Sequence, residues 1–268
     1  VWVGGKQEGG KLGDLFAFKQ DHIFKDWDDV KANANNRYDA IGELYGPAAW
    51  EALKDKAGKQ PIEPGDVCWA DLNNDGVINN LDRVKVGNLF PTVTGGFSTT
   101  LGYKDFSLYA RFDYALGHTL YNDLAARSLG QYQGSFNIID MVKDSWSETN
   151  QDTDIPKFYY ADQLSKKNIT RSNNGLTAVD NNSSRFYEKG DYLALREITL
   201  TWNLPKKWIN KALMSNASVY VTGQNLFYIT GYTGVSPEPA VDTTYGQGLD
   251  NGRYPTPKTV LLGLSVTF

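Results

Sequence analysis

The sequence has little cysteine and little histidine. Its 268 residues include one cysteine, Cys68, and two histidines, His22 and His118. A single cysteine cannot form a disulfide within the chain, and we interpret Cys68 as a structural residue. No H-E-x-x-H motif, spaced Cys/His set or G-x-S-x-G segment occurs. The signatures of zinc-dependent and serine hydrolases are therefore missing.

The chain also lacks a large excess of positive or negative charge. The chain has 27 basic and 31 acidic residues, a formal net charge of −4, and no cluster of Lys or Arg, which argues against a nucleic-acid partner. The carboxylates of Asp28, Asp29 and Glu238 could serve a glycosidase, but almost any acidic chain offers such groups. We therefore expect no enzymatic activity.

Long hydrophobic runs are missing as well. No stretch approaches the ~18 apolar residues of a transmembrane helix. The sequence shows no signal peptide and starts with Val1, so we expect a processed product or a part of a longer protein. Aromatic residues, in contrast, are plentiful: they make up 13% of the chain, with 16 Tyr and 7 Trp, as in proteins with interfacial aromatic belts.

Apolar and polar residues alternate in five segments of the second half of the chain. The pattern is clear in "FSLYARFDYALG", where Phe106, Leu108 and Phe112 share one face and Arg111 and Asp113 the other. It recurs in residues 97–103, 218–229 and 260–268, and Lys104-Asp105 forms a two-residue hairpin turn. In residues 192–204 the two halves are out of phase, which predicts a β-bulge near Arg196-Glu197.

These segments favour a membrane barrel over a soluble β-sandwich. The strands have the length that crosses a bilayer, their apolar faces are aromatic near the ends, and short connections alternate with long ones. Five strands cannot close a barrel, so we expect further strands outside this sequence. If the last strand ends in the periplasm at Phe268, the long connections 117–189 and 231–257 and residues 1–92 are extracellular.

Several stretches together resemble the SusC-like TonB-dependent transporters. The resemblance lies in "GDVCWADLNNDGVINNLDR", "VGNLFPTVTGGFSTTLGYKDFSLYARF", "SSRFYEKGDYLALREITLTWNLPKKW", "VYVTGQNLFYIT" and "GRYPTPKTVLLGLSVTF". The opening "GDLFAFKQDHIF" is similar to a further family segment, from which Ala17, Phe18 and His22 depart.

The resemblance implies an all-β fold, the C-terminal strands of a large antiparallel transmembrane barrel of about 22 strands with long extracellular loops. It also implies a Gram-negative outer-membrane importer of oligosaccharides or peptides. Its partners would be a SusD-like surface lipoprotein, outer-membrane lipid, the remaining strands and plug, and TonB through an N-terminal part not contained in this sequence. Residues 1–92 would then form an extracellular loop region and residues 93–268 the last five strands. In this family a C-terminal aromatic residue acts as an assembly signal, a role that would fall to Phe268.

The segment 71–82 predicts a calcium site of the EF-hand type. Gly76 permits the sharp turn, and the oxygen ligands, which suit Ca²⁺, come from Asp71, Asn73, Asp75, the Val77 carbonyl, Asn79 and Asp82. Asp82 replaces the usual Glu and the two Asn ligands are neutral, so weak binding is expected. The alternative is a solvated turn rich in Asp and Asn.

The predicted extracellular segments contain aromatic residues that could stack on cargo or contact a lipoprotein. They are Trp69, Tyr121, Tyr132, Trp146, Tyr159, Tyr160, Tyr232 and Tyr245. Such residues also pack loops internally. The alternative function from another class is a calcium-stabilised, secreted, β-rich glycan-binding module.

Overall fold

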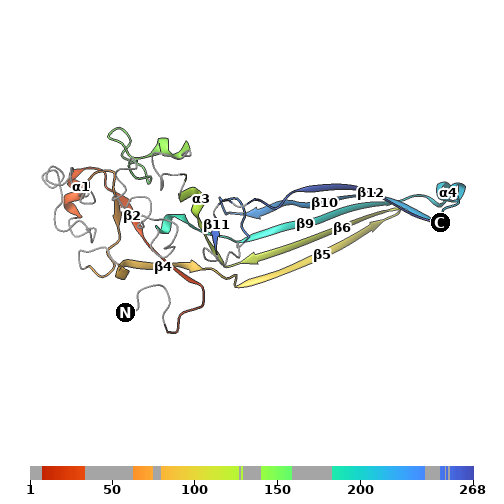
Figure 1. The fold of residues 1–268 in the computed structure, drawn as a ribbon, viewed down its shortest axis with the longest axis horizontal. Coiled ribbons are helices and arrows are strands. Elements are labelled where there is room, and N and C mark those ends of the chain that lie inside the picture. The colour runs from red at the N-terminus through yellow and green to blue at the C-terminus, as the bar shows by residue number, and fades with distance from the viewer. Residues whose placement is uncertain are drawn as a thin grey trace. The chain divides into compact units, whose positions relative to one another are not determined.

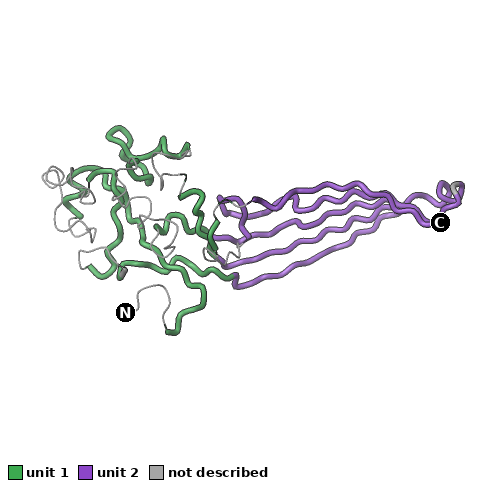
Figure 2. The backbone as a smooth tube through the Cα atoms, in the orientation of Figure 1, with its two compact units in different colours: residues 1–90, 119–188, 239–252 green, residues 91–118, 189–238, 253–268 purple. Residues whose placement is uncertain are grey.

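The computed structural model describes residues 8–33, 63–74, 80–126, 128, 140–158, 183–238, 248–250, 252 and 254–268. The chain divides into two compact units (Figure 2). The first unit contains residues 1–90, 119–188 and 239–252, and the second contains residues 91–118, 189–238 and 253–268. The second unit begins next to the predicted boundary at residue 92. The first unit also takes in much of the long connections of the second half.

The second unit is built on one antiparallel sheet with the strand order β12-β10-β9-β6-β5 (Figure 1). Its strands are β5 (Val93–Tyr103), β6 (Phe106–Leu116), β9 (Tyr192–Asn203), β10 (Asn216–Thr230) and β12 (Thr259–Thr267). The five strands expected from the alternation are confirmed. Short helices, α4 (Lys206–Ile209) and η7 (Asn210–Ala212), connect β9 to β10.

The hairpin turn and the bulge are confirmed too. Tyr103 pairs with Phe106 across the Lys104-Asp105 turn, where Lys104 takes a φ of 53°. In β9, Glu197 pairs with Arg111 and Leu195 pairs with Phe112, so Arg196 is the extra residue. The bulge restores the phase of the strand, because the apolar residues on both sides of Arg196 lie on the same face of the sheet.

The first unit consists of small sheets and short helices. Two antiparallel pairs form between β1 (Asp14–Phe18) and β4 (Arg83–Asn88), and between β2 (Gln20–Ile23) and β3 (Val67–Trp69). A further sheet has the order β11-β7-β8, from β11 (Leu249–Asp250), β7 (Thr119–Asn122) and β8 (Tyr187–Lys189). The helices are α1 (Trp27–Ala32), η1 (Asn80–Asp82), α3 (Asp123–Ala126), η3 (Asp140–Asp144) and η6 (Ser184–Phe186). The strands of this unit are too short for alternation to reveal them.

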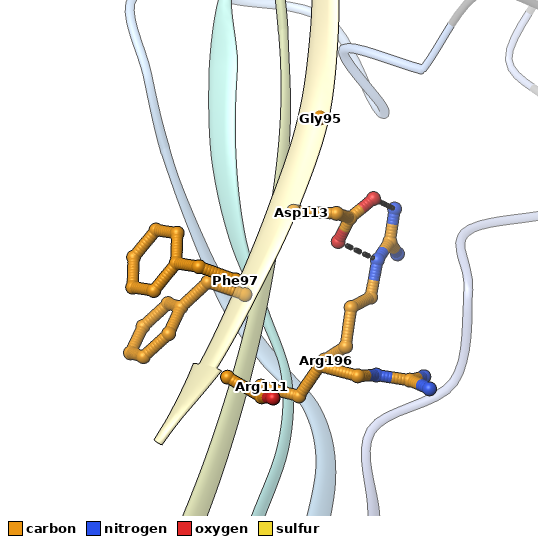
Figure 3. Close-up of a pocket in the computed structure, with 8 residues that line it drawn as sticks. Gly95, Phe97, Arg111, Asp113 and Arg196 are labelled. Atoms are coloured by element: carbon orange, nitrogen blue, oxygen red, sulfur yellow. Dashed lines mark hydrogen bonds and ion pairs between the residues drawn. The ribbon is translucent and has the colours of Figure 1, made fainter.

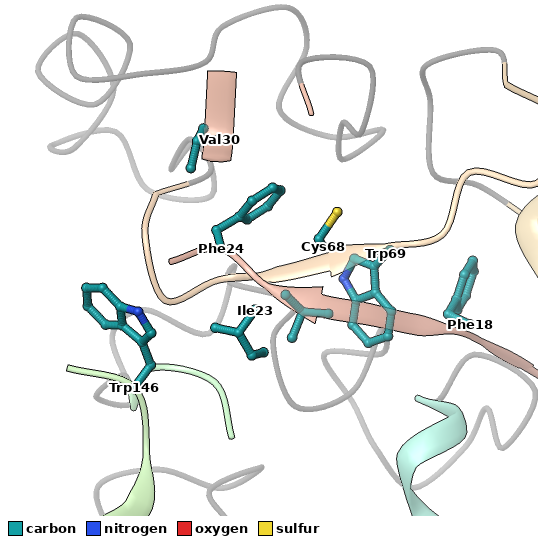
Figure 4. Close-up of a cluster of buried hydrophobic side chains, with 8 residues drawn as sticks. Phe18, Ile23, Phe24, Val30, Cys68, Trp69 and Trp146 are labelled. Carbon is teal, nitrogen blue, oxygen red and sulfur yellow. The ribbon is translucent and has the colours of Figure 1, made fainter. Parts of the chain in front are cut away.

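One apolar core of the first unit surrounds β2 and β3 (Figure 4). It consists of Phe18, Ile23, Phe24, Val30, Val67, Cys68, Trp69 and Trp146. Helix α1 contributes Val30 and is capped by Asp26, whose carboxylate accepts the backbone N–H groups of Asp28 and Asp29, both at 2.9 Å. Within the described residues, no helix is long and apolar enough to cross a membrane.

Polar contacts stabilise the pair of strands β1 and β4. On β1, the carboxylate of Asp14 lies 2.8 Å from Lys85 Nζ and 2.8 Å from Asn88 Nδ2, both on β4. These two hydrogen bonds lower the pKa of Asp14. Gly65 packs closely against Trp146 of the core: it takes a φ of +91°, and a Cβ there would lie 2.6 Å from the indole. Only glycine fits both conditions.

Candidate functional site

The five-stranded sheet has one apolar face. Register places Leu101, Leu108, Leu200, Val221 and Leu262 in a single row across all five strands. Four of these side chains are well exposed, with Leu101 at 61% and Leu262 at 77% at the two ends of the row. Other exposed members of the face are Phe97, Tyr103, Phe106, Phe227, Ile229, Val260 and Leu264. A continuous exposed apolar surface of this kind indicates contact with lipid or with another apolar surface.

The opposite face is polar. A row on this side consists of Ser98, Arg111, Glu197, Gln224 and Thr259, again one residue from each strand. Figure 3 shows the separation of the two faces, with Phe97 on one side of the sheet and Arg111, Asp113 and Arg196 on the other. The predicted phase of Arg111, Phe112 and Asp113 is therefore present in the fold.

Aromatic side chains gather at the end of the sheet where the Lys104-Asp105 turn lies. Phe106 stacks on Trp202 with ring centroids 6.0 Å apart, and Trp202 meets Trp208 edge-on at 5.8 Å. Tyr103 and Trp208 are 72% and 56% exposed. Exposed Tyr and Trp at the end of an apolar face are typical of the water–lipid interface of membrane strands.

The bulge directs Arg196 into an ion-pair network on the polar face. Its guanidinium pairs with Asp113 through two nitrogens, Nη2 lying 2.9 Å from Oδ2 and Nε pairing with Oδ1. It also donates to the Tyr228 hydroxyl at 3.1 Å and to the carboxylate of Glu238. The Tyr228 hydroxyl donates to Glu238 at 2.7 Å. One cation therefore pairs with two carboxylates, one of them outside the sheet.

This network holds residues 231–238 against the polar face. Glu238 is fixed by Arg196 and Tyr228, and the carbonyl of the preceding Pro237 lies 2.9 Å from Nε2 of the buried His118. The segment following β10 is thus anchored through both its main chain and its side chains. Sequence reasoning missed this function of Arg196 and Glu238, and the only signal was the change of phase at Arg196.

A hollow of about 610 Å³ lies beside β5. Gly95, Gly96, Arg111, Asp113 and Arg196 are among its lining residues (Figure 3). In the described sheet β5 has one neighbour, β6, so its outer edge is unpaired there. A further strand paired with that edge would add to the lining of the hollow, so its lining is incomplete in the described sheet.

The described part of the predicted calcium loop brings its two ends together. Asp82 is fully buried, and its Oδ1 accepts the backbone N–H of Leu72 at 2.9 Å. Asp71 is half-buried and Asn73 is exposed. Asp75, Val77 and Asn79 lie outside the described residues. The hydrogen bond places Leu72 and Asp82 side by side. Calcium binding stays a prediction.

The described aromatic candidates for cargo contact are buried. Trp69 and Tyr121 are 0% and 1% exposed, and Tyr232 and Trp146 are 7% and 8% exposed. Trp69 and Trp146 belong to the core in Figure 4, and Tyr121 packs with Phe186. Internal packing accounts for these positions and leaves little ring surface for a cargo. Tyr132, Tyr159, Tyr160 and Tyr245 lie outside the described residues.

Phe268 follows β12 and is 88% exposed. It continues the apolar series of that strand. Its role as an assembly signal stays a prediction.

Comparison with known proteins identifies the class. The chain is 31% identical to the TonB-dependent receptor P3 of Formosa agariphila over 243 residues, which cover 86% of the chain and 22% of the receptor. It is 32% identical to the TonB-dependent receptor P26 of the same organism over 217 residues, covering 78% of the chain and 20% of that receptor. No protein-family profile matches the sequence. The chain is therefore related to one part of the TonB-dependent receptors.

Two further similarities connect the chain to SusC-like transporters in particular. The chain is 25% identical to the TonB-dependent receptor SusC of Bacteroides thetaiotaomicron over 265 residues, covering 98% of the chain and 23% of SusC. The solved structure of the RagAB peptide transporter matches 76% of the chain and 21% of its own chain, with a TM-score of 0.58 and 23% identity. The fold is accordingly that of strands from a SusC-like β-barrel transporter, and the described sheet is not closed.

These relatives agree with the expectation that the chain is not an enzyme, since they are receptors and transporters. The chain spans about a fifth to a quarter of the length of the curated relatives that it matches.

Proposed function

We propose that the chain forms part of the barrel wall of an outer-membrane importer of the SusC type. The observation that carries this proposal is the two-faced sheet, in which an exposed apolar row alternates with a polar row across five strands. The similarity to TonB-dependent receptors supports the same function. In this arrangement the apolar face lies against lipid and the polar face lines the lumen.

The sheet edges support the need for a larger barrel. In the described residues, β5 and β12 each have one neighbouring strand in the sheet. Unpaired backbone groups in lipid cost several kcal/mol each, roughly, so both edges must pair with further strands of the transporter. The lumen would then contain the Arg196 network, with residues 231–238 lying over the polar face.

The partner that we propose is a SusD-like surface lipoprotein, and the cargo class is an oligosaccharide or a peptide. Two similarities support this proposal. The relative from Bacteroides thetaiotaomicron is the TonB-dependent receptor SusC, and the similar solved structure is that of the RagAB peptide transporter. Coupling to TonB would require a part of the receptor that this sequence does not contain.

Extraction from membranes tests the proposal. The full-length protein is expected to remain in the outer-membrane fraction until detergent is added, and then to elute together with the lipoprotein. Mass spectrometry of the purified complex would identify both the partner and any bound cargo. Recovery of the protein in aqueous buffer without detergent would support the runner-up, a calcium-stabilised secreted glycan-binding module.

We also propose that residues 71–82 bind Ca²⁺ and brace an extracellular segment. The spacing of the oxygen ligands in the sequence supports this role, together with the hydrogen bond from Leu72 to Asp82, which places the two ends of the segment side by side. Weak binding would be sufficient outside the cell, where sites of this kind have Kd values of roughly 10⁻⁴–10⁻³ M.

Replacement of Asp71 by Asn tests the calcium site. At a calcium concentration ten times the Kd, the ion should stabilise the wild-type protein by about 1.4 kcal/mol, and this gain should shrink in the variant. Thermal melting with calcium and with a chelator would be compared for the wild type, Asp71→Asn and the exposed control Asp28→Asn. An equal response to calcium in all three proteins would contradict the proposal.

A further inference from the structure

A cluster of three possible metal ligands lies where β2 pairs with β3. The register of this pair places His22 opposite Cys68, and Asp21 precedes His22 on β2. One ligand atom from each of these three residues lies within 4.8 Å of the others. Nitrogen, sulfur and oxygen donors are thereby combined, although Cys68 lies far from Asp21 and His22 in the sequence.

The imidazole of His22 is oriented from both sides. Its Nδ1 lies 2.9 Å from Oδ2 of Asp21, and its Nε2 lies 3.2 Å from Oδ1 of Asp29 on α1. Asp29 is itself fixed, since it accepts the backbone N–H of Lys25 at 2.9 Å and the Asn33 amide at 2.9 Å. Histidines that bind metals usually donate their second N–H to such a carboxylate, which fixes the tautomer and makes the first nitrogen a better ligand.

An ion could enter this cluster from solvent. Cys68 is only 2% exposed, yet it lines a pocket of about 330 Å³ together with Asp21, Asp71 and Asn74. The side chain of Asp21 is 56% exposed and can rotate. Two ligands of a tetrahedral zinc ion with bonds of about 2.0–2.3 Å lie roughly 3.3–3.8 Å apart. Nδ1 of His22 and Oδ2 of Asp21, which lie 2.9 Å apart, would therefore have to separate slightly around the ion.

We propose that Asp21, His22 through Nδ1, and Cys68 through Sγ bind a zinc-class divalent cation, with water from the pocket as the fourth ligand. The thiolate selects Zn²⁺ over Ca²⁺ and Mg²⁺, which require oxygen ligands. On binding, the Cys68 S–H bond breaks, a metal–sulfur bond forms and the proton passes to the buffer. Asp29 is a positioning residue that holds the imidazole. The proposal does not depend on the transport function.

The alternative is that Asp21, His22 and Asp29 form a hydrogen-bonded array beside a core cysteine. The two interpretations differ in the bonds formed by sulfur. Cobalt is the probe of choice, because Co²⁺ occupies sites of this type and a cobalt–thiolate bond has its own charge-transfer absorption. The full-length protein, purified through a tag without histidine, would be titrated with CoCl₂ in the presence of excess calcium.

We expect the cobalt–thiolate band in the wild type and its loss in Cys68→Ser, which keeps nearly the same volume. His22→Gln should also abolish the band while leaving the cysteine in place, so the result does not rest on one variant. Asp29→Asn should weaken binding about 10–100-fold, whereas Asp28→Asn, the same change on the exposed neighbour, should not. Heat-modifiability on gels would show that each variant is folded.

The absence of the band from the folded wild type at saturating cobalt would overturn the site. An unchanged affinity in folded Cys68→Ser or His22→Gln would do the same. Equal affinities of Asp29→Asn and Asp28→Asn would remove the positioning role of Asp29.

Discussion

Arginine in place of Leu264 is expected to destabilise the membrane-inserted protein by about 2–4 kcal/mol and to lower its amount in the outer membrane. Leu264 is 66% exposed on the apolar face of β12, opposite Val219 on β10. A charge at this position would enter the hydrocarbon region if that face contacts lipid. Membrane fractionation and the temperature of heat-modification on gels would measure the effect in the full-length protein.

The adjacent residue provides a matched control. Ser265 lies on the polar face of the same strand, where it pairs with Ser218. Because successive side chains of a strand point to opposite faces, Ser265→Arg would face the lumen and should assemble nearly normally. If Leu264→Arg resists heat as well as Ser265→Arg does, the apolar face does not contact lipid and the proposed orientation is wrong.

The second large effect is expected for Arg196→Met. This variant keeps a long side chain at the bulge but leaves Asp113 and Glu238 without their shared cation. The side chain of Arg196 is 17% exposed and the two carboxylates are 35% and 33% exposed, so solvent screens part of the loss. We expect a destabilisation of about 1–3 kcal/mol.

Arg196→Met should also loosen residues 231–238 locally, in addition to lowering the overall stability. Residues 231–238 are held to the sheet by Glu238 and by the Pro237 carbonyl, so hydrogen exchange in this segment should accelerate in Arg196→Met. Arg111→Met is the control, because Arg111 is exposed on the same face and its loss should change stability by less than about 0.5 kcal/mol. Equal exchange in both variants would show that Arg196 does not anchor the segment.

The sheet could be predicted from the sequence because its strands are long. Each of the five segments repeats the two-residue period several times, so the hairpin turn at Lys104-Asp105 and both faces follow from the pattern. The bulge was predictable for the same reason. A phase change between Leu195 and Ile198 has one simple explanation in a continuous strand, an extra residue.

The contacts between distant segments could not be predicted in this way. The ion pair between Arg196 and Glu238 depends on how residues 231–238 fold back onto the sheet, and no periodic pattern encodes that path. The proximity of His22 and Cys68 depends on the register of two very short strands. Trp69 and Trp146 are of the types that bind sugars, but burial follows from the three-dimensional core and not from residue type.

The spacing of the strands has a consequence for the order in which the sheet forms. Two residues separate β5 from β6 and a short connection separates β9 from β10, whereas residues 117–191 lie between β6 and β9. Closing that long segment costs about 3 kcal/mol more chain entropy than closing the two-residue turn. We therefore expect each hairpin to pair before β6 and β9 do. Until β6 and β9 pair, both strands expose unpaired backbone groups. Aggregation therefore competes with folding at this pair of strands.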